Sequence, residues 1–132
     1  MSHQMEYSSK WWALTIPCSW DVEETRDNVK FRLPGNGSLV VSALKKQSGS
    51  VTESDVNRYA RRFLDAGWTE SQVEWDNFSG IRLLSSDREY AERFYVSRNA
   101  LLLVIVYMHG QQDSSDEADV LSALRSIRVL RG

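Results

Sequence analysis

The stretch WWALTIPCSW, residues 11–20, decides how this fold begins. Every second residue from Trp12 to Ile16 is large and apolar. Successive side chains of a β-strand point to opposite faces, so this spacing predicts a strand with one apolar face. Pro17 cannot donate a backbone hydrogen bond, and the strand is expected to stop there. Trp11 falls on the opposite face beside smaller residues, and it is the aromatic side chain of the stretch that we expect to be partly exposed.

The same alternation with a period of two continues along most of the chain. Further strands are expected over residues 29–33, 38–45, 72–77, 80–86, 89–98 and 100–108. Apolar residues recur at helical spacing behind capping residues in two segments, which predicts helices from Thr52 to Gly67 and from Ser114 to Ile127. The order β-β-β-α-β-β-β-β-α indicates an α+β fold, in which an antiparallel sheet of about six to seven strands is flanked by two helices.

The length and charge of the chain limit the kinds of protein that it can be. Its 132 residues fit a single domain, expected over residues 10–132 behind a flexible N-terminal tail of residues 1–9. The 16 basic and 18 acidic residues give a formal net charge of −2, which argues against nucleic acid as a partner. The longest apolar run, Ala100–Met108, is far shorter than the roughly 20 residues of a membrane-spanning helix, so no membrane insertion is expected. The N-terminal residues lack an apolar segment, which favours a cytoplasmic protein.

Each candidate for catalysis or metal binding has a simpler structural explanation. His109 has no second histidine near it in the sequence and is interpreted as a turn residue. Cys18, the one cysteine, lacks a local group that would lower its thiol pKa. The acidic residues near the second helix lack the spacing of a calcium loop and match the helix dipole; they are Asp113, Asp116, Glu117 and Asp119. We therefore expect no catalytic residue, no metal and no cofactor.

One sheet surface stands out as a candidate partner-binding face. The strand faces opposite the apolar stripes combine aromatic side chains with arginines, a composition typical of protein interfaces. The residues that we expect to carry binding are Trp11, Arg32, Arg82, Arg93 and Tyr95. The alternative is a solvated face with cross-strand ion pairs, such as Arg82 with Glu74 or Asp76.

Several packing and turn motifs resemble those of the superfamily named for PsbP, an extrinsic subunit of photosystem II. The resemblance runs from Trp12 to Leu130. It is carried by residues 14–17 (LTIP), 31–34 (FRLP), 39–42 (LVVS), 79–81 (SGI) and 124–127 (LRSI), and by residues 59–64 in the first helix. It implies the PsbP-like α/β/α sandwich, which also serves a Ran-binding nuclear import factor and the bacterial DcrB-like proteins. None of the motifs is catalytic.

The resemblance also carries an expectation about function. Cytoplasmic bacterial relatives of this length include adaptor-chaperones of type VI secretion, which hold hydrophobic segments of secreted effectors on the sheet surface, often as dimers. We therefore expect a non-enzymatic protein-binding module, an adaptor or chaperone, and whether it forms a homodimer stays open. The alternative is a small-ligand carrier or enzyme with a pocket between helix and sheet, supported by the tryptophans, His109 and Cys18.

Overall fold

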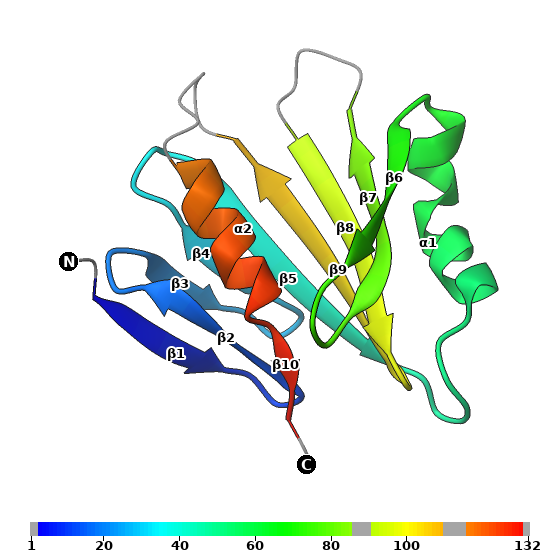
Figure 1. Cartoon of the computed structure of the whole chain (residues 1–132), viewed down its shortest axis with the longest axis horizontal. Helices are drawn as coiled ribbons and strands as arrows, with labels where there is room; N and C mark the ends of the chain where they lie inside the picture. The colour runs from blue at the N-terminus through cyan, green and yellow to red at the C-terminus, as the bar shows by residue number, and fades with distance from the viewer. Residues whose placement is uncertain (1–2, 86–90, 110–115, 131–132) are drawn as a thin grey trace.

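Two antiparallel sheets and two helices make up the fold of the computed structural model, which describes residues 3–85, 91–109 and 116–130 (Figure 1). The larger sheet has seven strands in the order β3-β4-β5-β9-β8-β7-β6, and the smaller has three in the order β1-β2-β10. The elements are β1 (Gln4–Ser8), β2 (Trp12–Pro17), β3 (Asp21–Glu24), β4 (Val29–Arg32), β5 (Ser38–Lys45), α1 (Glu53–Asp65), β6 (Thr69–Glu74), β7 (Ser79–Leu84), β8 (Ala91–Arg98), β9 (Leu101–Met108), α2 (Glu117–Arg125) and β10 (Arg128–Val129).

The expected α+β class, with a large antiparallel sheet and two helices, is confirmed. The N-terminal segment differs from the expectation, because residues 4–8 form β1 instead of a flexible tail. This strand pairs with β2 from Gln4 opposite Pro17 to Ser8 opposite Ala13. The Tyr7 ring also packs edge-on against Phe31, with the ring centroids 5.4 Å apart. Tertiary contacts therefore order a segment whose own apolar alternation is weak.

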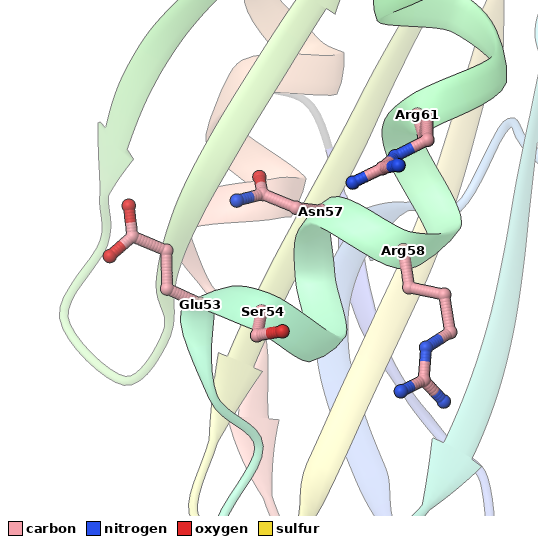
Figure 2. A pocket seen from close by; sticks show the side chains of 5 residues that line it. All are labelled: Glu53, Ser54, Asn57, Arg58 and Arg61. Carbon is pink, nitrogen blue, oxygen red and sulfur yellow. The ribbon is translucent and has the colours of Figure 1, made fainter.

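The two helices cover opposite faces of the seven-stranded sheet. In Figure 2, α1 lies in front of the strands and α2 lies behind them. The core on the α2 side also includes side chains of the three-stranded sheet, among them Trp12 and Leu14. The core on the α1 side is smaller and is centred on Val56 and Ala60 of the helix. The apolar strand β9 lies between β5 and β8 at the centre of the sheet, as its apolar residues on both faces predict.

Local sequence signals set the ends of α1. The Thr52 side chain accepts a hydrogen bond from the Asp55 backbone, and the Asp55 carboxylate accepts one from the Thr52 backbone, which completes the expected capping box. Gly67 takes a φ of +93° just beyond the helix, a conformation that glycine adopts without strain. Neither helix in the described ranges is long and apolar enough to span a membrane.

Helix α1 leaves part of its own face of the sheet uncovered. Its main contacts are with β7 and β8, on the β6 side of the sheet, and its core also includes Leu102 of β9. Strands β4 and β5 lie beyond β9, on the other side of the sheet's centre. The α1 side of these strands carries side chains that are half-buried or exposed, such as Val40 and Leu44. We call this uncovered region the open face and define its residues below.

Candidate functional site

The five residues expected to form one binding surface lie on two faces of the fold. Arg32 of β4 and Arg93 and Tyr95 of β8 point to the α1 side of the seven-stranded sheet. Arg82 of β7 points to the opposite side, where its guanidinium lies over the Phe94 ring. The prediction of a single surface is therefore wrong, although three of its members do share a face.

Tyr95 was expected to bind a partner, but only 1% of it is exposed. It belongs to the core under α1, and its hydroxyl accepts a hydrogen bond from Arg93 Nε at 2.8 Å. The Arg93 guanidinium lies 3.9 Å from the centre of the Phe63 ring, so Arg93 is half-buried at the edge of the helix. Alternation along β8 separates two faces correctly, but it does not reveal that a helix covers this one.

Trp11 lies in the connection between β1 and β2, on the α2 side of the molecule. Its ring packs against the core, and it is partly buried, as expected. The ammonium groups of Lys10 and Lys45 lie over the ring, 5.2 and 5.7 Å from its centre. These cations flank Trp11 as in a cation–π contact. Trp11 is thus separated from the arginines with which it was grouped.

Arg82 bonds Glu92 and not Glu74 or Asp76. Arg82 Nε donates to Glu92 Oε1 at 2.6 Å, and Glu92 Oε2 lies 2.5 Å from His109 Nε2. Only 3% of Glu92 is exposed, so its carboxylate is a buried charge held by two partners. Glu92 was not among the residues predicted from the sequence. The signal available was its position on the same face of β8 as the buried Phe94 and Val96.

Tyr107 extends this network along β9. Its ring stacks on His109 with centroids 4.1 Å apart. Burial, followed by the charges of Asp116, Glu92 and Glu117, raises the pKa of Tyr107 to about 12. The network joins the adjacent ends of β7, β8 and β9, and we interpret its role as structural.

The open face consists of the side chains that β5 and β9 present on the α1 side, which are aliphatic except for Ser38 and Ser42. Residues on these strands face one another in the pairs Val40–Val106, Ser42–Val104 and Leu44–Leu102, with Ser38 opposite Met108. Leu44 is 40% exposed and Met108 is 43% exposed. Tyr59, which is 48% exposed, borders the face from α1. A groove of about 260 Å³ runs between α1 and the end of β5, lined in part by Leu44, Tyr59 and Leu102.

Basic side chains border the open face. Lys30 and Arg32 lie on β4, where Arg32 and Glu23 form an exposed ion pair at 3.4 Å. Across the groove, Lys46 Nζ bonds Asp55 Oδ2 at 2.7 Å. The hydrogen bond from Lys46 and those from Thr52 lower the pKa of Asp55 to about 2, so this carboxylate is ionised at neutral pH.

A hollow of about 510 Å³ lies on the outer side of α1 (Figure 2). Its lining side chains are polar and solvent-facing: Glu53, Ser54, Asn57, Arg58 and Arg61. It is a depression between long side chains and not an enclosed chamber. Between α1 and the sheet, Val56, Ala60 and Tyr95 are packed in a buried core. Beside this core, a hollow of about 290 Å³ lies between the start of α1 and strands β6, β7 and β8, which is where the alternative expectation placed a ligand pocket.

Comparison with known proteins gives matches in structure alone. No protein-family model and no curated protein sequence matches the chain. A crystal structure of a protein from Bacteroides thetaiotaomicron is similar with a TM-score of 0.70 and 15% identity; the match covers 99% of this chain and 50% of that protein. The solution structure of cyanobacterial PsbP (CyanoP) from Synechocystis sp. is similar with a TM-score of 0.62 and 16% identity, covering 98% of this chain and 94% of CyanoP. The chain thus spans half the length of the Bacteroides protein, and it has a PsbP-like fold.

Proposed function

We propose that this protein is a non-enzymatic, cytoplasmic binding module, an adaptor or chaperone, whose protein partner docks on the open face. The observation that carries the proposal is the exposure of Leu44, Tyr59 and Met108 around one half-covered sheet surface. Exposed apolar side chains gathered on one surface and rimmed by polar residues are characteristic of interaction sites. Scattered apolar residues would need no such explanation.

The arrangement has the two zones of a protein interface. Aliphatic side chains of β5 and β9 form the centre, and charged side chains of β4 and α1 form the border. The resemblance to the adaptor-chaperones of type VI secretion favours a sheet surface as the binding site, since those proteins hold effector segments on their sheets. Of the residues first expected to bind, Arg32 and Arg93 remain at the border of this face.

The proposal is tested with aspartate substitutions in the centre of the open face. The partner is first captured from the source organism and purified, and its affinity is then measured by calorimetry against Leu44→Asp and Met108→Asp. Each variant is expected to weaken binding by about tenfold or more, since a buried charge replaces an apolar contact.

Met5→Asp is the matched control, because Met5 is 42% exposed and lies on β1 in the other sheet. Its affinity is expected to equal that of the native protein. Native affinity in both open-face variants would rule out this surface as the binding site.

A further inference from the structure

We infer that the partner segment is acidic and amphipathic, with aliphatic side chains for the centre of the open face and carboxylates for its border. This inference rests on the proposed function and specifies the partner's chemistry. It follows from two independent properties of the surface, the apolar character of its centre and the excess of basic groups around it.

The centre accepts aliphatic side chains because its own side chains are mostly aliphatic, with Ser42 between Val40 and Leu44. Val104 and Val106 are half-buried between Leu44 at one end and Met108 at the other. A methionine side chain is flexible and polarisable, so it adapts to side chains of different shape. Tyr59 is the aromatic residue that borders the groove beside Leu44.

The border is basic on both sides of this centre. Arg58 lines the groove from α1, and Arg62 follows Tyr59 by three residues on the same side of that helix. Arg93 lies opposite Val106, and on the far side Lys30 lies opposite Val40.

Among the described residues, the acidic groups near this face are engaged by a basic side chain or lie at its edge. Asp55 bonds Lys46, Glu23 bonds Arg32, and Asp21 lies on the outermost strand β3. The described residues of the face therefore carry an excess of positive charge, although the whole chain has a formal net charge of −2. Such segregation of charge favours a partner with carboxylates and disfavours one with lysines or arginines.

A protein segment fits this surface better than single-stranded nucleic acid. Binding of single strands relies on bases stacked on successive aromatic rings. The strands of the open face present valine, leucine, methionine and two serines but no aromatic side chain, and their aliphatic groups pack against aliphatic groups of a partner.

The experiment uses two synthetic peptides that share the same leucine and valine positions and differ only in having glutamate or lysine at the polar positions. Methyl NMR shifts of Leu44, Val104 and Val106 report where each peptide binds, and fluorescence anisotropy gives the affinity. An oligothymidine strand is the third probe. The glutamate peptide is expected to bind at these methyl groups, and more tightly than either other probe. Its affinity should fall as salt is raised, because salt screens exposed charges.

Arg58→Glu and Arg61→Glu form a matched pair on one helix. Figure 2 shows Arg58 extending toward the side where β5 lies, while Arg61 extends over the outer surface of α1. Arg58→Glu is expected to lower the affinity for the glutamate peptide by roughly fivefold, which is the upper range for an exposed ion pair. Arg61→Glu is expected to leave that affinity unchanged.

Two results would overturn the inference. One is equal or tighter binding of the lysine peptide or of oligothymidine at the open face, and the other is equal effects of the two arginine substitutions. Either result leaves the proposed function intact if the captured partner still loses affinity with Leu44→Asp. Native partner affinity in Leu44→Asp and Met108→Asp would reject the proposed function itself.

Discussion

Gly80 of β7 is the position where a single methyl group is expected to do the most damage. A Cβ placed there would lie 1.9 Å from the backbone oxygen of Tyr95 and 2.9 Å from Val96 Cα, both in the neighbouring strand β8. Because the obstructing atoms are backbone, β7 and β8 must separate by about 1 Å to restore a contact of 3.0 Å. A hydrogen bond stretched by that amount is effectively lost. Losing two of these bonds and loosening Tyr95 under α1 gives an expected cost of about 3 kcal/mol for Gly80→Ala.

The measurement is urea unfolding followed by tryptophan fluorescence. Gly49→Ala is the control. A Cβ at Gly49 would meet no atom within 4 Å, so the strain expected there comes only from its φ of +75°. A left-handed conformation costs an alanine about 1 kcal/mol, so this control is expected to lose only that amount. The explanation by close strand approach is refuted if Gly80→Ala loses no more stability than Gly49→Ala.

The remaining predictions concern the two carboxylates with defined partners. Glu92→Leu is expected to cost about 2–4 kcal/mol in urea unfolding, because Arg82 and His109 lose the buried charge that both contact. The double variant Arg82→Leu/Glu92→Leu should recover part of this loss, and a double variant less stable than Glu92→Leu would contradict the pairing. The pKa of Asp55 is lowered from 3.8 to about 2. The contribution of its carboxylate to the free energy of unfolding is therefore present above pH 4 and is lost as the pH falls toward 2. Asp55→Asn should therefore show a flatter decline of stability across that pH range, and equal slopes would speak against the bonds from Lys46 and Thr52.

Local sequence signals were sufficient to predict the central helices and strands of the fold. The capping box at Thr52 and the apolar alternation of β5 and β8 act within a few residues, and the structure has these elements where the patterns predict them. The strands missed were β1, β3 and β10, which are short or polar and lie at sheet edges. Edge strands depend on pairing with a distant partner, so their own residues carry little signal.

The site was harder to predict, because a strand pattern separates two faces without showing what covers each. Arg93 and Tyr95 are correctly placed on one face of β8, yet Tyr95 is buried under α1. The alternative interpretation of the strand faces paired Arg82 with a nearby acidic residue, Glu74 of β6 or Asp76 in the following turn. The register of β7 with β8 instead brings Arg82 beside Glu92. Such a choice between partners depends on the register of the sheet and not on local composition.

The unequal covering of the two sheet faces connects the fold to the proposed function. The α2 side is covered by a helix and also by the three-stranded sheet, whose strand β2 is buried along most of its length. In the part of the chain that the structure describes, α1 alone covers the other side, and its main contacts are with β7 and β8. Leu44 of β5 and Met108 of β9 therefore stay exposed at opposite ends of these strands, although their neighbours Leu102 and Ala91 are buried. Burying them requires an additional element on this face, and a docked partner segment would supply the layer that the chain has on the other side.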